Sequence, residues 1–275
     1  MRKYLLLILL TAMLLPNVVF GAVANNLVSC WELDEESGTR VDAVLSSGND
    51  LTDNNTVLFG TGKIGNAADF EFDTTEYLSI SDGSQTGLDL GAGDFSFSVW
   101  IKLESDTSGG QDILAKRDGS AVAGYHWRIN SPALTVSLHT RSGSSGETET
   151  ADTAVTTGSF FHLVVTRAAS DGAVVFYLNG SSDGSGNTSR NVDTTGQFTV
   201  GRNGDNNDAH FDGLIDIAAV WNKVLTASEV AELYNSGNAI SCATIITEEG
   251  GQNTQGFIIG FLHRIIDLFS SFIFV

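Results

Sequence analysis

Short apolar segments separated by clusters of Gly, Ser, Asn and Asp follow one another between residues 27 and 242. The clearest is the segment 95–103, in which every odd-numbered residue is apolar and the even-numbered residues are Ser, Ser, Trp and Lys. Because side chains alternate across a strand, the odd positions predict a face buried in a core, and Trp100 indicates a second face that is half covered. Many short strands with turn residues between them are typical of an all-β sandwich or barrel.

The remaining segments complete this pattern. Asn179 and Gly180 favour a tight hairpin turn, because both residues tolerate a positive φ. Polar loops are expected at 142–146 and 183–187. Further strands are predicted at 134–139, 161–167, 174–178, 198–201 and 214–221.

One short helix is predicted near the end of the strand-rich region. Thr226 and Glu229 have the spacing of a capping box, in which each side chain bonds the backbone of the other residue. Val230, Leu233 and Tyr234 supply its apolar side, and Gly237 is expected to end it.

Composition adds a large core and a strong negative charge. The 275 residues are 42% hydrophobic and include 16 Phe, so a sizeable core can be buried. A net charge of −19 repels phosphate backbones, which argues against nucleic acid as a partner. The acidity serves either solubility in a salty medium or the binding of a hard cation such as calcium by loop carboxylates.

The first residues have the features of an export signal. Arg2 and Lys3 precede an apolar run, and Ala22-Val23-Ala24 matches a small-residue cleavage site. We predict a signal peptide over residues 1–24 and therefore a secreted or cell-surface protein. An uncleaved anchor is the alternative, but Pro16 and Asn17 interrupt the apolar run.

The chain has two cysteines, Cys30 and Cys242, at the two ends of the strand-rich region. In an oxidising compartment they favour a disulfide that joins the first and last strands of the domain 25–242. Two unpaired buried thiols are the alternative.

The C-terminal part differs from the rest of the chain. Residues 243–256 are polar and contain glycine, which is typical of a linker, whereas 257–275 are strongly apolar. This helical tail is barely long enough to span a bilayer and would place His263, Arg264 and Asp267 in mid-span. We expect membrane or envelope association through an interfacial or self-associating helix, with docking on a partner protein or on the chain's own domain as alternatives.

Several segments, in this order and spacing, resemble the laminin-G-like, concanavalin-A-like lectin and glucanase jelly-roll superfamily. They are the opening LVSCWELDEESGT, the blocks 65–70 and 77–80, the core strands 95–100, 161–167 and 176–180, and the closing 211–216 and 221–230. The resemblance covers about residues 27–240. It implies an all-β, antiparallel jelly-roll sandwich with one short C-terminal capping helix, followed here by the hydrophobic helical tail.

Members of this superfamily often bind calcium, and the resemblance transfers that expectation to particular residues. Asp34 after the opening strand and Asp216 in the closing strand are the candidate ligands, with Asn49 and Asp50 as further oxygen donors. Many relatives have Asp-Glu in the closing strand, whereas Ile217 follows Asp216 in this chain. The alternative is that Asp34 and Asp216 only accept hydrogen bonds from loop backbone.

Candidate ligand contacts come from loops that combine aromatic rings with amides and charges, a mixture that often holds sugars. Tyr125 and Trp127 have a second interpretation, as residues that pack at the edge of the core. Asp205 and Asn207 equally suit a loop cation or a solvated turn. The candidates are Arg117, Tyr125, Trp127, Arg202, Asn203, Asp205 and Asn207.

Catalysis is not expected. The acidic run from Glu32 to Glu36 is similar to the E-x-D-x-x-E strand of laminarinase-like enzymes, but Ser37 occupies the third carboxylate position. The five His residues show no zinc-binding spacing, and His162 is expected to be a packing or hydrogen-bonding residue rather than a base. We therefore expect an exported, surface-associated module that binds glycans and is stabilised by calcium. The alternatives are an adhesion protein that binds other proteins and assembles through its tail, and a glycoside hydrolase.

Overall fold

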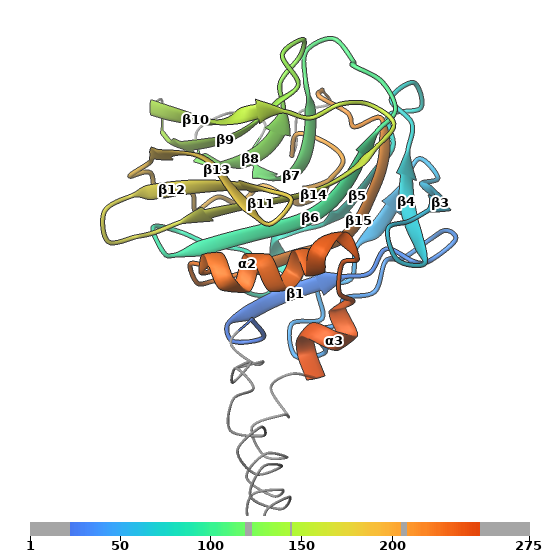
Figure 1. Cartoon of the computed structure of the whole chain (residues 1–275), viewed down its shortest axis with the longest axis horizontal. Helices are drawn as coiled ribbons and strands as arrows, with labels where there is room; N and C mark the ends of the chain where they lie inside the picture. Colours follow the sequence, from blue (N-terminus) through green and yellow to red (C-terminus); the bar gives the residue numbers. More distant parts are fainter. Residues whose placement is uncertain (1–22, 119–122, 144, 205–207, 248–275) are drawn as a thin grey trace, which may run out of the picture. The chain divides into compact units, whose positions relative to one another are not determined.

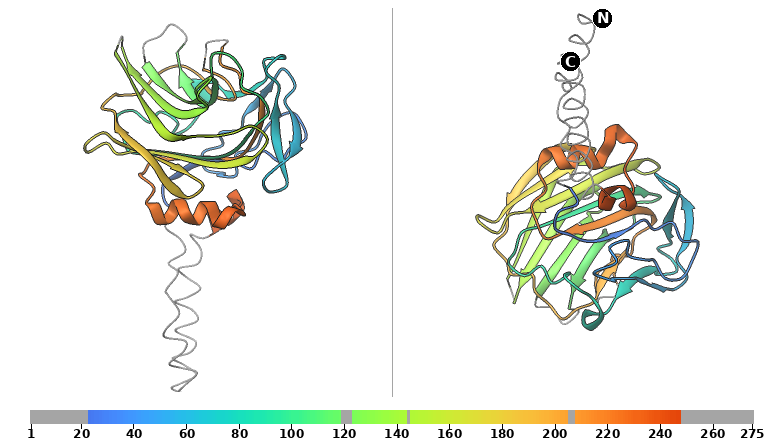
Figure 2. Two further views of the ribbon diagram at one scale, coloured as in Figure 1. Left: turned by 45° about the horizontal axis from the view of Figure 1, so that its top comes forward. Right: turned by 90° about the horizontal axis from the view of Figure 1, so that it is seen from below.

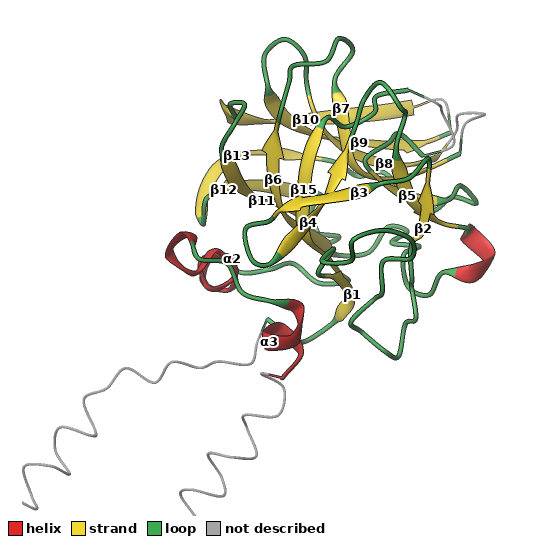
Figure 3. Cartoon of the chain, turned by 90° about the vertical axis from the view of Figure 1, so that its right-hand side faces the viewer, coloured by secondary structure: helices red, strands yellow, loops and turns green. Residues whose placement is uncertain are grey.

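A computed structural model of the chain describes residues 23–118, 123–143, 145–204 and 208–247. Residues 26–246 form one compact unit. Within it, two antiparallel sheets lie face to face, and the helices lie outside the first sheet (Figures 1 and 3). The all-β sandwich predicted from the strand pattern is confirmed.

The first sheet has eight strands among the described residues, and β1 (Leu27–Trp31) pairs with β15 beside the main path. Its order is β13 (Ser181–Asn187), β12 (Ala173–Leu178), β11 (Phe160–Arg167), β6 (Phe95–Leu103), β15 (Gly213–Trp221), β4 (Asn66–Phe70) and β3 (Leu58–Thr61). The right-hand view of Figure 2, taken from below, shows this sheet in front of the second one.

The second sheet has seven strands among the described residues, and Figure 1 shows it across the sandwich from β6 and β11. Their order is β10 (Ser145–Ala154), β9 (Thr135–Ser142), β8 (Ala123–Ile129), β7 (Gln111–Arg117), β14 (Phe198–Val200), β5 (Tyr77–Ile80) and β2 (Thr52–Asn54). The helices are α2 (Ala227–Tyr234) and α3 (Cys242–Thr247), with 3₁₀ turns η1 (Asp82–Ser84) and η2 (Asn235–Gly237).

The core between the sheets is rich in aromatic rings. Phe97 of β6 lies 5.1 Å from Tyr125 and 6.0 Å from Trp127 of β8, measured between ring centroids. Trp31 stacks on Phe198 at 5.4 Å. All five side chains are fully buried. The apolar face predicted for the segment 95–103 is therefore the face that packs against the second sheet.

The other face of β6 is covered by α2 and the segment before it. Trp100 stacks on His162 at 5.1 Å and on Tyr234 of α2 at 5.7 Å, and only 3% of its surface is exposed. Ser96 Oγ donates to the carbonyl of Lys223 and accepts from the backbone N–H of Leu225. The half-covered face predicted from Trp100 is thus more fully buried, because α2 and the segment before it lie on it.

Burial under this cover lowers the pKa of His162 to about 3. Its folded state therefore requires a neutral imidazole, whereas the unfolded chain binds a proton near pH 6.5. The contribution of the neutral His162 to the free energy of unfolding is fully present above pH 6.5 and is lost as the pH falls toward 3. At pH 5 this loss is about 2 kcal/mol. Urea unfolding at pH 7.5 and pH 5 should show a smaller loss for His162→Gln than for the unsubstituted chain. Equal losses would contradict this assignment.

The loop predicted at 183–187 is wrong, and the loop predicted at 142–146 is only partly right, because Gly143 lies in the turn between β9 and β10. Residues 145–154 and 181–187 form β10 and β13, the edge strands of the two sheets. Their side chains are mostly solvent-exposed or half-buried, so the alternation of apolar residues that identifies inner strands is missing. The two edges meet through polar contacts, as when Thr153 donates to Asp183.

The predicted turns and helix are largely confirmed. Asn179 and Gly180 have φ of 50° and 78° between β12 and β13, as the hairpin turn requires. The capping box of Thr226 and Glu229 is present at the start of α2. The helix ends at Tyr234 rather than near Gly237, because Asn235 adopts the left-handed conformation there.

The predicted pairing of Cys30 with Cys242 is confirmed, with sulfurs 2.01 Å apart. The bridge links β1 to the first residue of α3 rather than to a last strand. Since α3 extends to Thr247, the segment predicted as a linker begins as a helix. Residues 1–22 of the predicted signal peptide and the tail 257–275 lie outside the described residues. Within the described residues no helix has the length and apolar character needed to cross a bilayer.

Candidate functional site

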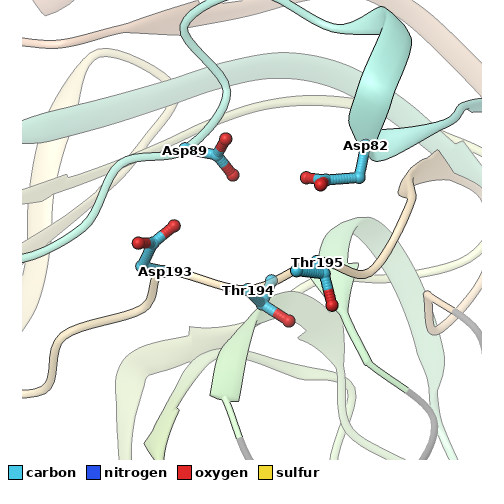
Figure 4. Close-up of a pocket in the computed structure, with 5 residues that line it drawn as sticks. All are labelled: Asp82, Asp89, Asp193, Thr194 and Thr195. Atoms are coloured by element: carbon cyan, nitrogen blue, oxygen red, sulfur yellow. The ribbon is translucent and has the colours of Figure 1, made fainter.

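Two loops that connect strands form an open, oxygen-rich pocket, which we call the acidic pocket. It has a volume of about 290 Å³ and is lined by Asp82, Asp89, Asp193, Thr194 and Thr195. In Figure 4 the three carboxylates point into the space between the loops. One loop runs from β5 to β6 and the other from β13 to β14.

Alternation of apolar and polar residues places these carboxylates. Leu88 and Leu90 are buried in the core on either side of Asp89, which leaves Asp89 exposed. In the facing loop Val192 is buried and the next residue, Asp193, is exposed. Each loop is therefore anchored by aliphatic side chains that direct the neighbouring carboxylate outward.

Lys116 of β7 contacts residues of both loops. Its side chain is fully buried, and its Nζ lies 2.6 Å from Asp82 Oδ1, 2.7 Å from Asp89 Oδ1 and 2.6 Å from the carbonyl oxygen of Thr194. The ammonium has three donors, and these partners satisfy all of them. This arrangement fixes the relative position of the two loops and still leaves carboxylates in excess over ammonium at the pocket.

The chemistry available in the acidic pocket is that of hydrogen-bond acceptance and of hard-cation binding. Carboxylate and hydroxyl oxygens accept from ligand hydroxyl groups, and the threonine hydroxyls also donate. The lining contains no aromatic ring, so a ligand would be held by polar contacts rather than by stacking. Excess negative charge disfavours anionic ligands.

The candidate calcium ligands Asp34 and Asp216 both hold the turn 62–66. Asp216 Oδ2 accepts from the backbone N–H of Lys63 at 2.6 Å and of Ile64 at 3.1 Å. Asp34 Oδ1 accepts from the N–H of Asn66 at 2.6 Å. The structure brings these two residues to one turn, with the loop-backbone hydrogen bonds that the alternative interpretation required.

Asp216 retains an unusual feature. It is fully buried, and its Oδ1 has no hydrogen-bond partner among the described residues. Burial raises its pKa to about 7, and the charges of Asp34 and Glu32 add to that effect against the two backbone hydrogen bonds. A buried carboxylate oxygen without a partner is costly.

Asn49 and Asp50, the other two candidate ligands, have different partners. Asn49 is fully buried, donates to Ser29 Oγ and to the carbonyl of Thr86, and accepts from the N–H of Thr86. Asp50 accepts from the N–H of Asp42. Asn49 therefore uses its side chain to fasten the loop before β6 to β1, and these contacts give it a structural role.

Tyr125 and Trp127 are wrong as ligand contacts. Both are fully buried and belong to the aromatic core between the sheets. The alternation along β8 turns these two side chains inward, while His126 between them faces the opposite side of the sheet. The second interpretation, packing in the core, is correct.

The remaining candidate ligand residues lie near one another. Asn203 donates to Asp208 Oδ1 at 2.9 Å, and its Oδ1 accepts from Arg117 Nη1 at 3.5 Å. Arg202 is 7% exposed, lies over the ring of Tyr77 at 3.5 Å and donates to the carbonyl of Gly204. Arg202 is thus structural, and Arg117 and Asn203 form a polar pair. Asp205 and Asn207 lie outside the described residues.

Sequence reasoning did not single out the acidic pocket. Its aspartates stand in ordinary loop sequences, and Lys116 lies in a strand where a surface position was equally reasonable. It also did not find Asp69, Glu71 and Glu104, whose ligand atoms lie within 4.8 Å of one another near β4. Glu71 and Glu104 are exposed, and exposed acidic groups of this kind commonly gather without a metal. The pocket is identified by a buried lysine with acidic partners, and the burial of that lysine could not be predicted from the sequence alone.

A family model described as the concanavalin A-like lectin/glucanases superfamily, of the laminin G type, matches residues 72–231. Adhesion G-protein coupled receptor V1 of Danio rerio is 27% identical over 148 residues, which are 51% of this chain. The chain spans 2% of the length of that receptor.

Solved structures share the fold. Domain 4 of AbnA, an extracellular GH43 arabinanase from Geobacillus stearothermophilus solved in complex with arabinotriose, superposes with a TM-score of 0.62 at 23% identity. The match covers 75% of this chain and 97% of that domain. The binding domain of Paraclostridial Mosquitocidal Protein 1 gives 0.64 at 16% identity, over 78% of this chain and 53% of that one. At these identities the likeness shows the fold alone.

Proposed function

This chain belongs to the concanavalin A-like lectin/glucanases superfamily, and we propose on that basis that it is a binding module for neutral carbohydrate. The observation that carries this proposal is the acidic pocket, where three carboxylates and two threonines surround one open cavity. Sugar hydroxyls donate well to carboxylates, and such charge-assisted hydrogen bonds are stronger than those between neutral groups.

The pocket also indicates which carbohydrates would bind. Its volume of about 290 Å³ lies at the lower end of the range for small-ligand sites, which suits a terminal sugar unit. Its excess of carboxylates disfavours sulfated, phosphorylated and other anionic glycans. The arabinanase domain, which is similar in fold and was solved with arabinotriose, supports the choice of a neutral glycan.

Calcium is part of the proposal as a structural ion at Asp34 and Asp216. These residues fit a bound calcium ion in one respect. Asp216 Oδ1 is buried without a partner among the described residues, and Asp34 holds the same turn. Both are hard oxygen donors of the kind that calcium takes. Backbone carbonyls and water would complete the six to eight oxygens. When bound, the ion would neutralise this buried charge and tighten the turn 62–66.

The proposed function requires the protein to be located outside the cell. The disulfide between Cys30 and Cys242 supports an oxidising environment. Export through the signal peptide and attachment to a membrane or envelope by residues 257–275 stay predictions from the sequence. Binding rather than catalysis is the proposed role, with a glycan as the partner outside the cell.

A glycan array with the full-length chain tests the proposal, first with calcium and then with a chelator. Neutral glycans should bind, and calorimetry should show an affinity at least about tenfold lower for Asp193→Asn, which removes a charged acceptor. The matched control is Asp152→Asn, an exposed aspartate of β10.

The possible results are distinct. Binding that weakens in chelator supports the calcium part, while binding unchanged in chelator contradicts that part alone. If no neutral glycan binds with calcium present, or if Asp152→Asn and Asp193→Asn bind equally well, the carbohydrate proposal is wrong.

A further inference from the structure

Two histidines lie side by side on the outer face of the second sheet. His126 of β8 and His139 of β9 are direct partners in the antiparallel register, and their ring centroids are 4.3 Å apart. Because Tyr125 and Trp127 point into the core, His126 points to the opposite face. Residues directly opposite on neighbouring strands have Cβ atoms about 5 Å apart, which allows both side chains to reach one ligand.

Each imidazole is held by a hydrogen bond at the same ring nitrogen. His126 Nδ1 lies 2.9 Å from Asp112 Oδ2, and the carboxylate of Asp112 is fully buried. His139 Nδ1 lies 2.8 Å from Thr148 Oγ1 on β10. If Nδ1 is the donor in both bonds, the proton is on Nδ1 and the Nε2 lone pairs are free. Neither Nε2 has a hydrogen bond to another described residue.

This arrangement is the usual one around metal-binding histidines. The ring nitrogen that does not bind the metal donates to a carboxylate, carbonyl, hydroxyl or water, which fixes the orientation of the ring and raises its basicity as a ligand. Here Asp112 and Thr148 occupy those positions.

The surroundings of His139 disfavour its protonated form. Burial first, and then the charges of His126, Arg128 and Arg117, lower the pKa of His139 to about 3. Arg128 Nε also lies 3.3 Å from Asp112 Oδ1 and offsets part of the negative charge behind His126. A neutral imidazole is the form that binds a metal, although the two arginines limit the affinity for a cation.

We propose that His126 and His139 together bind a divalent transition-metal ion of the zinc and copper class through their Nε2 atoms. Imidazole nitrogen suits these ions, whereas calcium requires oxygen. With two protein ligands the ion keeps open positions for water or for a ligand atom. The two rings are inclined by 32° to each other, so the side chains must rotate for both Nε2 atoms to reach one ion. This site is separate from the acidic pocket and does not depend on the proposed function.

Calorimetric titration of the full-length chain with Zn²⁺ and with Cu²⁺ tests the site, in calcium-containing buffer. We expect a single ion per chain, an affinity at least about tenfold lower in His126→Gln and in His139→Gln, and electron paramagnetic resonance of the Cu²⁺ form that shows two coordinating nitrogens. Thr148→Val, which frees His139 without removing a ligand, should weaken binding by a smaller factor. His263→Gln is the control for binding by the tail and should behave like the unsubstituted chain.

Thermal unfolding without metal establishes that each variant is folded. His139 is partly exposed, so His139→Gln keeps the test valid if His126→Gln does not fold. No binding to the unsubstituted chain would overturn the proposal. So would unchanged binding in His139→Gln, or binding that is lost only in His263→Gln.

Discussion

Replacing Cys30 and Cys242 together by alanine is expected to lower the free energy of unfolding by about 2 to 5 kcal/mol. The disulfide closes a loop of 212 residues, so it removes a large part of the conformational freedom of the unfolded chain. It also fastens α3 to β1, and among the described residues β1 pairs with a single named strand, β15. Urea unfolding followed by tryptophan fluorescence measures the change.

The unsubstituted chain treated with a thiol reductant is the matched control and should unfold at the same urea concentration as the alanine double variant. Both cysteines are fully buried, so a single Cys30→Ala variant should show the same loss with a free Cys242. A change below about 1 kcal/mol would contradict the assignment of the disulfide as a main stabilising element.

The variant Trp127→Ala is expected to lose about 3 to 5 kcal/mol of stability. The side chain of Trp127 is fully buried, and its ring lies 6.0 Å from that of Phe97 in the centre of the sandwich. Removing it leaves a cavity that the rigid neighbouring strands cannot fill. Thermal and urea unfolding measure the loss.

Trp127→Phe separates this structural role from a ligand contact. It keeps an aromatic ring in the core and removes an indole N–H that has no hydrogen-bond partner among the described residues, so it should cost much less than Trp127→Ala. Glycan affinity of Trp127→Phe should equal that of the unsubstituted chain. Lost affinity in a stable Trp127→Phe protein would restore Trp127 as a binding residue.

The strand pattern predicted several inner strands because burial on one face repeats every second residue, but it did not predict β7 and β8. The segment 95–103 was predicted with both its ends, and it is β6. The edge strand β10 was not predicted and most of β13 was taken for a loop, because little of either face is buried there. Tyr125 and Trp127 were misplaced because they were taken for loop residues, whereas they lie in β8 with their side chains turned into the core.

The sequence predicted less of the candidate site than of the fold. Lys116 meets Asp82, which is 34 residues away along the chain, and Thr194, which is 78 residues away. Asp216 meets the turn 62–66 across 153 residues. No local sequence pattern predicts these long-range contacts, because they depend on which strands become neighbours in the sheets.

The sequence by itself determined the all-β class, several of the inner strands, the Asn179-Gly180 turn, the capping box and the pairing of the two cysteines. Each depends on local geometry or, for the cysteines, on there being a single possible partner. Only the tertiary structure decided which polar residues gather: the carboxylates over Lys116, the two aspartates at the turn 62–66, and the paired rings of His126 and His139. Strand order and register bring these groups together, and both follow from how the whole chain buries its core.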